Sequence, residues 1–183
     1  MKIAIIIGST RPGRKGEAVA KWVLEHASKR TDATFEIVDI AEANLPLLDE
    51  PMPAIVGKYA HEHTKAWSRK IAPYDSFVFV IPEYNHGLPA ALKNAIDYLY
   101  AEWVNKAAGI VSYGAIGGAR AAEQLRLVLA QLQLADVQGQ VMLSLNTDFD
   151  GNTPKPAAHQ EKALDTMLNQ VVAWAKALGT LCQ

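Results

Sequence analysis

The chain has 183 residues, a formal net charge of −1, 50% hydrophobic and 20% charged residues. This length predicts a single domain, residues 1–183, whose core needs no disulfide or metal to fold. The near-neutral charge argues against a nucleic-acid binder. The first apolar run is too short for membrane insertion, and the one cysteine, Cys182, excludes an internal disulfide. We therefore expect a cytoplasmic protein.

Short apolar runs alternate along the chain with longer segments of helical spacing. In chain order, strands are predicted at 2–8, 34–39, 76–81, 109–112 and 140–145, and helices at 17–30, 58–72, 89–103, 118–133 and 157–178. Such alternation predicts an α/β fold, a parallel sheet with right-handed crossovers and helices on both faces. Ligands of these sheets bind beyond the carboxyl ends of the strands, so the loops after the first, third and fourth strands are the candidates.

The loop after the first strand, GSTRPGRKG, does not carry either common nucleotide motif. Gly8 and Gly13 have the P-loop spacing, but Arg14 and Lys15 stand where a Lys-Ser/Thr pair should be. The dinucleotide fingerprint fails because Thr10 replaces its second glycine. Both Mg-nucleotide hydrolysis and the usual dinucleotide site are therefore disfavoured.

The same loop has the groups that hold a terminal phosphate. Ser9 and Thr10 offer hydroxyls, and the backbone N–H groups at the start of the next helix add to them. Arg11 can supply a charge-assisted hydrogen bond, with Arg14 and Lys15 as weaker candidates. A surface turn with solvated basic residues is the open alternative.

Two further loops offer groups suited to a flat ring. PEYNHG, after the third strand, sets mixed donors and acceptors beside an aromatic side chain. SYGAIGG, after the fourth strand, has glycines that permit close backbone approach, and Tyr113 could flank a ring. The alternatives are a core aromatic for Tyr84, a helix-start carboxylate for Glu83 and a tight turn for the second loop. Convergence of three loops on one sheet edge favours a ligand site.

The segments GSTRPGR, LPLLDEPMP, PEYNHGLPAALKNAIDYLY and VSYGAIGGARAAEQLR resemble the NADPH-dependent FMN reductase family, a flavodoxin-like group. The likeness extends to about residue 132. It implies a flavodoxin-like three-layer sandwich whose five-stranded parallel sheet has the order 2-1-3-4-5. It also implies bound FMN, NADPH or NADH as electron donor, and a homodimer or homotetramer. Trp103 would then lie either near a subunit contact or in the core.

The resemblance also assigns cofactor contacts in three groups. The phosphate group would lie at Ser9, Thr10, Arg11, Glu17, Ala18 and Val19. The flavin ring would rest on Pro82, Glu83, Tyr84, Asn85, His86 and Gly87. Its other side would be lined by Ser112, Tyr113, Gly114, Gly117 and Gly118. Many relatives have Ser and Asn where this chain carries Arg14 and Gly16, which leaves open how Arg11, Arg14 and the backbone share the phosphate.

The resemblance implies that hydride passes from the nicotinamide to the flavin and then to a small acceptor. Free flavin, quinones, azo compounds and oxidised metal ions are all candidates. Because the flavin carries the reaction, no side chain is assigned as catalytic. No metal site is expected, since His61 and His63 have no third ligand at suitable spacing.

The sequence also bears on three other functions. A non-enzymatic electron carrier of the flavodoxin type is disfavoured by the near-neutral charge. A hydrolase at Ser9 or Ser112 would lack the G-x-S-x-G elbow. A regulatory module would bind nucleotide without oxidising NAD(P)H.

Overall fold

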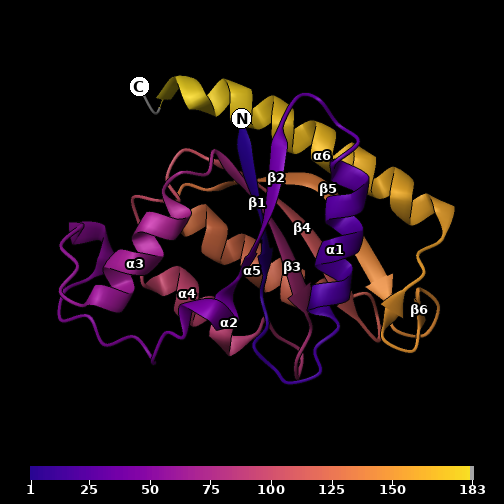
Figure 1. Ribbon diagram of the computed structural model, residues 1–183, viewed down its shortest axis with the longest axis horizontal. Helices are drawn as coiled ribbons and strands as arrows, with labels where there is room; N and C mark the ends of the chain where they lie inside the picture. The colour runs from indigo at the N-terminus through magenta and orange to yellow at the C-terminus, as the bar shows by residue number, and fades with distance from the viewer. Residues whose placement is uncertain (182–183) are drawn as a thin grey trace.

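A computed structural model describes residues 1–181, and Cys182 lies outside the described residues. Its centre is a parallel sheet in the order β2-β1-β3-β4-β5, which confirms the predicted topology. Figure 1 shows the strands running from the N-terminus at the top to their carboxyl ends below. The strands are β1 (Lys2–Ile7), β2 (Thr34–Asp39), β3 (Ser76–Pro82), β4 (Ala107–Gly114) and β5 (Ala135–Ser144).

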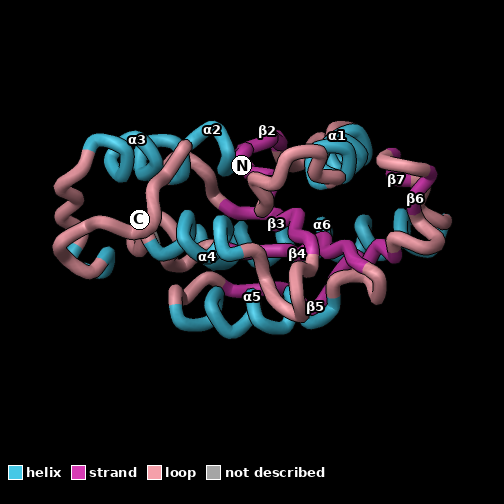
Figure 2. Tube along the Cα trace, turned by 90° about the horizontal axis from the view of Figure 1, so that it is seen from below, coloured by secondary structure: helices cyan, strands magenta, loops and turns pink. Residues whose placement is uncertain are grey.

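Helices cover both faces of the sheet, as Figure 2 shows in a view rotated by 90°. One face carries α1 (Gly16–Ala27) and α6 (Ala158–Leu178). The opposite face carries α2 (Ile40–Ala43), α3 (Glu62–Ile71), α4 (Ala90–Asp97) and α5 (Ala119–Gln131). No helix among residues 1–181 is long and apolar enough to cross a membrane.

The apolar strand runs follow from this covering of both faces. Along β1, Ile3 and Ile5 face α1 and α6, while Ala4 and Ile6 face the other helices. Successive side chains of a strand point to opposite faces, so a strand covered on both sides has few positions suited to a polar residue. In β3 all seven residues are buried.

The predicted helix 89–103 is too long. Helix α4 ends at Asp97, and residues 98–103 form turns. The helical spacing predicted too long a helix because Leu99 and Trp103 still reach the core from these turns. Trp103 is 1% exposed, and its ring meets that of Phe77 edge-on at 4.8 Å. Trp103 is expected either near a subunit contact or in the core, and the structure places it in the core.

Other predicted boundaries are also corrected. Helix α3 begins at Glu62 rather than residue 58, because residues 45–60 form an irregular segment held by side chains. Strands β4 and β5 begin at Ala107 and Ala135, earlier than predicted, because their first two residues also pair, ahead of a register irregularity between Ala108 and Ile110. The sequence reading missed α2 and the hairpin of β6 (Phe149–Asp150) and β7 (Thr153–Pro154). It also missed two 3-10 helices, Ala54–Val56 and Gly179–Leu181.

Replacing Trp103 with Ala tests its place in the core. Removal of a fully buried indole should lower the free energy of unfolding by about 3–5 kcal/mol, measured by urea denaturation. Trp174→Ala is the control, because Trp174 is 45% exposed on α6 and should change the stability by less than about 1 kcal/mol. Equal losses in the two variants would contradict the burial of Trp103.

Candidate functional site

Three loops meet at the carboxyl edge of the sheet, the lower edge in Figure 1. We call residues 8–15 loop one, residues 83–89 loop two and residues 114–118 loop three. The Gly8 N–H donates to the Val80 carbonyl at 2.9 Å, and the Glu83 N–H donates to the Tyr113 carbonyl at 3.0 Å. The Ser9 and Tyr84 hydroxyls lie 2.8 Å apart. The predicted convergence of the loops is therefore direct contact.

Arg14 is committed to contacts within the protein. Its guanidinium donates to the Ser9 carbonyl at 2.8 Å and pairs with Asp39 at the end of β2. It also lies 2.9 Å from the carboxylate of Glu17 in the first turn of α1. Two carboxylates neutralise this cation, so Arg14 shapes loop one more than it offers charge to a ligand.

Lys15 is turned away from the loop toward the β6–β7 hairpin. Its ammonium donates to the Gly151 carbonyl and to Asn152 Oδ1, and lies 5.2 Å from the centre of the Phe149 ring. Arg11 differs from Arg14 and Lys15, because its exposed guanidinium has neither a carboxylate nor a hydrogen-bond acceptor as partner among residues 1–181. Of the three cations in loop one, Arg11 alone remains to meet an anion.

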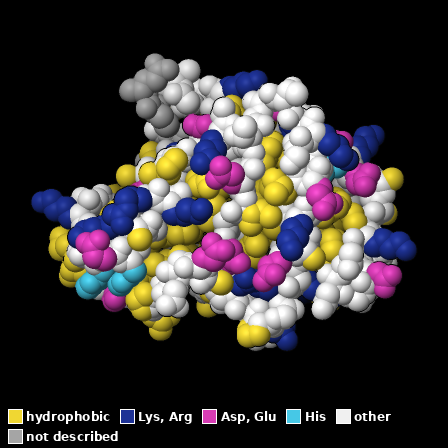
Figure 3. Space-filling view, viewed as in Figure 1, with side chains coloured by type: hydrophobic (Ala, Val, Ile, Leu, Met, Phe, Trp, Pro, Cys, Tyr) yellow, Lys and Arg dark blue, Asp and Glu magenta, His cyan; other side chains and the backbone are white. Residues whose placement is uncertain are grey.

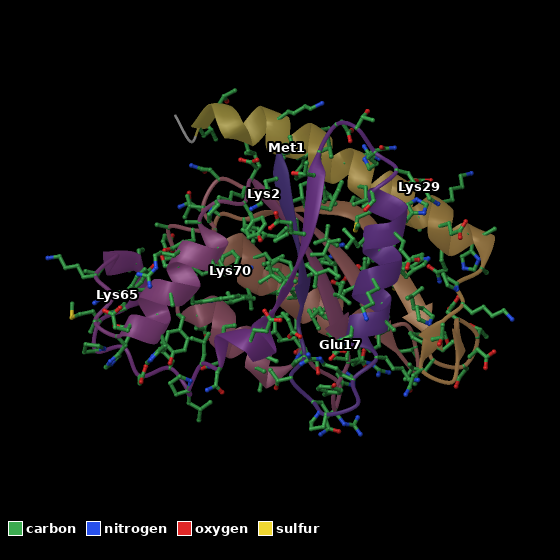
Figure 4. The ribbon with its side chains drawn as sticks, viewed as in Figure 1. Met1, Lys2, Glu17, Lys29, Lys65 and Lys70 are labelled. Carbon is green, nitrogen blue, oxygen red and sulfur yellow. The ribbon has the colours of Figure 1, made fainter. Side chains whose placement is uncertain are left out.

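Helix α1 presents its N-terminus to the same place. The helix begins at Gly16, and Lys15 at its N-cap makes no side-chain capping hydrogen bond. The first N–H groups and the positive end of the helix dipole are therefore left for an anion. A Cβ at Gly16 would lie 3.0 Å from the Tyr113 hydroxyl, so glycine permits α1 to lie close to β4. Figure 4 shows Glu17 at this lower end of α1.

Two buried polar atoms beside loop one have no hydrogen-bond partner: Arg14 Nε and the Tyr113 hydroxyl. Tyr113 is only 4% exposed, with its ring beneath α1 rather than on the surface of loop three. Burial and the nearby Tyr84 hydroxyl both raise the pKa of Tyr113, so it stays protonated and able to donate. Unpartnered donors at this depth indicate a site with spare hydrogen-bonding capacity.

Loop two is a tight turn. Tyr84 and Gly87 exchange backbone hydrogen bonds of 3.0 Å in both directions. Between them, Asn85 and His86 have φ angles of 47° and 72°, a conformation that non-glycine residues rarely adopt. The turn therefore needs support, and Gln124 of α5 donates to the His86 carbonyl at 2.9 Å. Sequence reasoning missed Gln124, which lies 38 residues away without a local signal.

Glu83 is a helix-start carboxylate, but for α5 rather than for the helix that follows it. Its side chain is 9% exposed and accepts hydrogen bonds from the Arg120 backbone at 3.1 Å and guanidinium at 2.7 Å. Burial tends to raise the pKa of Glu83, but the hydrogen bonds from Arg120 outweigh it, and the pKa lies below its ordinary 4.5. Glu83 thus joins loop two to the start of α5.

Loop three is shaped by its glycines. Gly117 and Gly118 have φ angles of 74° and 72°, and a Cβ at Gly118 would lie 2.8 Å from the Tyr113 nitrogen. The Ser112 hydroxyl is buried and donates to the Gly117 carbonyl at 2.6 Å. A Cβ at Gly114 would lie 3.3 Å from Glu83 Cβ, so Gly114 packs against loop two. These residues leave mainly backbone for a ligand to contact.

A cavity of about 530 Å³ opens beside Thr10, between α2 and α4. His61 and His63 lie elsewhere, at the start of α3, with their ring centres 5.2 Å apart, and His63 Nε2 lies 2.9 Å from an Asp49 carboxylate oxygen. Figure 3 shows histidine side chains on the surface there. Residues 1–181 contain no group of three or more side chains placed to hold a metal ion.

Comparison with known proteins gives consistent results. The family model for NADPH-dependent FMN reductase matches residues 1–148. An NAD(P)H-dependent FMN reductase of Schizosaccharomyces pombe is 40% identical over 182 residues, 98% of this chain and 84% of that protein. A 2-hydroxy-1,4-benzoquinone reductase of Burkholderia is 30% identical, covering 96% and 97% of the two chains. The flavoenzyme FerB of Paracoccus denitrificans, an NAD(P)H:(acceptor) oxidoreductase, superposes with a TM-score of 0.74, 21% identity and coverages of 96% and 97%.

Glu83→Gln should lower the free energy of unfolding at neutral pH by about 1.5 kcal/mol, the low end for hydrogen bonds to a charged group. Because the folded-state pKa of Glu83 is lowered, its contribution is complete at neutral pH and is lost as the pH falls from 4.5 through the folded pKa. The difference between the two proteins should therefore shrink in acid, measured by denaturation at several pH values.

Glu123→Gln is the matched control on α5, the helix that carries Arg120, since Glu123 is 77% exposed and lies 4.0 Å from Arg126. It should change the stability by less than about 0.5 kcal/mol at either pH. A pH-independent effect of Glu83→Gln would show that its ionised form makes no stabilising contact.

Proposed function

Because the chain belongs to the NADPH-dependent FMN reductase family, we propose that loops one, two and three hold FMN along the carboxyl edge of the sheet. The protein is an oxidoreductase with FMN as cofactor and a nicotinamide nucleotide as electron donor. Family membership favours this reading over a flavodoxin-type electron carrier.

The observation that carries the proposal is the anion site at loop one. Loop one supplies the unpaired Arg11 guanidinium and the Ser9 and Thr10 hydroxyls, and it leads directly into the uncapped N-terminus of α1. The unpartnered hydroxyl of Tyr113 lies at its base. A phosphate monoester accepts several hydrogen bonds and carries negative charge, so it fits this donor set.

Each group of loop one has its own task. Arg11 would pair with the phosphate, and the backbone N–H groups of Glu17 and Ala18 would donate to it, whereas the Val19 N–H donates to the Lys15 carbonyl at 3.1 Å. Arg14 acts as a positioning residue, because it holds the Ser9 carbonyl rather than facing the ligand. This division answers how the basic residues share the phosphate, with Arg11 as the charged partner.

Loops two and three would hold the ring. FMN, when bound, supplies the hydride chemistry by accepting two electrons from a nicotinamide and passing them on. The turn from Tyr84 to Gly87 would lie along the ring, with the backbone N–H groups of Asn85 and His86 available to the ring edge, since those of Tyr84 and Gly87 bond within the turn. Asn85 and His86, both exposed at the tip of the turn, would contact the acceptor or donor.

We propose quinones and free flavin as the acceptors, since the relatives that match nearly full length are named for reactions of these two classes.

We also propose a cytoplasmic homodimer or homotetramer. Five apolar side chains of the 45–60 segment are exposed, and its backbone is held by Asn94 and Tyr98. A rigid, exposed apolar patch is typical of a protein contact. The five side chains are Leu47, Leu48, Met52, Ile55 and Val56. Sedimentation of the purified chain as a monomer would contradict this assembly.

The function is tested by adding FMN to the purified protein and following its absorbance and fluorescence, and then following NADPH and NADH oxidation with benzoquinone. We expect saturable FMN binding and quinone-dependent consumption of the nicotinamide. A chain that binds FMN but oxidises neither nucleotide would be a carrier. A chain that does not bind FMN would overturn the proposed site.

Arg11→Ala should weaken FMN binding by about 1.5–3 kcal/mol, the size of a hydrogen bond to a charged group. That is roughly a 10- to 150-fold rise in Kd, measured by quenching of flavin fluorescence. Lys29→Ala removes the same charge at the far end of α1, where Figure 4 shows Lys29, and should leave Kd within about twofold. Equal effects of the two substitutions would remove Arg11 from the phosphate site.

A further inference from the structure

We propose that the hydrogen bond between Ser9 and Tyr84 couples the phosphate subsite to the ring subsite, so that an anion bound at loop one sets the position of loop two. The inference rests on the proposed function and adds to it a basis for preferring phosphorylated flavins over riboflavin. Tyr84 is a positioning residue in this scheme.

The hydroxyl geometry supplies the first step. Ser9 is 1% exposed, and its Oγ accepts a hydrogen bond from the Arg11 N–H at 3.3 Å while lying 2.8 Å from the Tyr84 hydroxyl. Each of the two hydroxyls has one proton, and only one proton lies between them. Whichever hydroxyl donates within the pair, the other proton is left. An anion at loop one that accepts this second proton would polarise and strengthen the contact between the pair.

Tyr84 transmits this contact to loop two because it begins the turn. Its backbone is joined to Gly87 in both directions, so residues 84–87 form one hydrogen-bonded unit. A second link runs from loop one, since the Arg11 guanidinium carbon lies 6.0 Å from the centre of the Tyr84 ring. Movement of the Tyr84 side chain therefore moves the surface proposed to hold the flavin ring.

The turn depends on such support. Asn85 and His86 adopt positive φ angles, which persist only where surrounding contacts hold them. Gln124 holds the α5 side of the turn through the His86 carbonyl and the Leu88 N–H. The Ser9–Tyr84 contact holds the opposite side. Loss of that contact leaves the side-chain hydrogen bonds of loop two to α5 alone.

Coupling between two subsites is reciprocal. A phosphate at loop one should therefore raise the affinity of the ring subsite for a flavin that carries no phosphate of its own. Riboflavin and inorganic phosphate, the two halves of FMN supplied separately, are the probes that reveal this coupling without the covalent link.

The experiment titrates riboflavin into the purified full chain with and without inorganic phosphate, with potassium chloride at matched ionic strength as the salt control, and follows quenching of riboflavin fluorescence. In the unmodified protein, phosphate should raise riboflavin affinity by about 5- to 20-fold, within the usual range for coupled sites. In Tyr84→Phe the enhancement should fall below about twofold. Tyr100→Phe is the matched control, because Tyr100 lies in a different cavity, beside Glu102 and Lys106, and should keep the enhancement.

Ser9→Ala tests the other end of the contact and should lose the enhancement as Tyr84→Phe does, while thermal unfolding reports whether each variant is folded. The same enhancement in the unmodified protein and in both variants would overturn the proposal, as would no enhancement in the unmodified protein. If the unmodified protein binds FMN and oxidises NADPH but shows no coupling, the proposed function stands and this inference fails. If FMN does not bind, the proposed function fails as well.

Discussion

The burial of β3 on both faces is the constraint on which the rest of the structure depends. All seven residues of this strand are inaccessible to solvent, so helices must cover both sides of the sheet, and neighbouring strands must be joined by crossovers that carry those helices. The resulting parallel register places Ile7 beside Val80 and Ile81 beside Ser112. The chain then leaves β1, β3 and β4 at one edge, and every contact among the three loops follows from that alignment.

Much of this arrangement could be predicted from the sequence because its causes are local. Apolar runs of strand length located the strands, and the composition of GSTRPGRKG and PEYNHG indicated loops with ligand chemistry. The helix ends were less accurate, since the apolar spacing of Leu99 and Trp103 continues past the point where α4 stops. The spacing of apolar residues indicates which side chains face the core, but a series of turns can bring those side chains to the core as well as a helix can.

The pairings within the site could not be predicted, because they join positions distant in the sequence. Glu83 meets Arg120 and Arg14 meets Asp39 only after the sheet has formed, and neither pair has a spacing that a sequence pattern would reveal. The same applies to Tyr113, whose alternating position on β4 turns its ring under α1 instead of toward the edge. A loop sequence therefore indicates which chemical groups are present, whereas the tertiary partners decide which of them are free.

The division of charge in loop one has a consequence for how long a flavin stays on the protein. Only Arg11 keeps an unneutralised guanidinium, and it is exposed to solvent, where mobile ions screen its field within about 10 Å at moderate ionic strength. At the proposed phosphate site, most of the remaining hold on the tail of the cofactor would come from short-range backbone donors. The residence time of a flavin held in this way should shorten as salt rises, which would suit a protein that exchanges flavin with its surroundings rather than one that keeps a permanent prosthetic group.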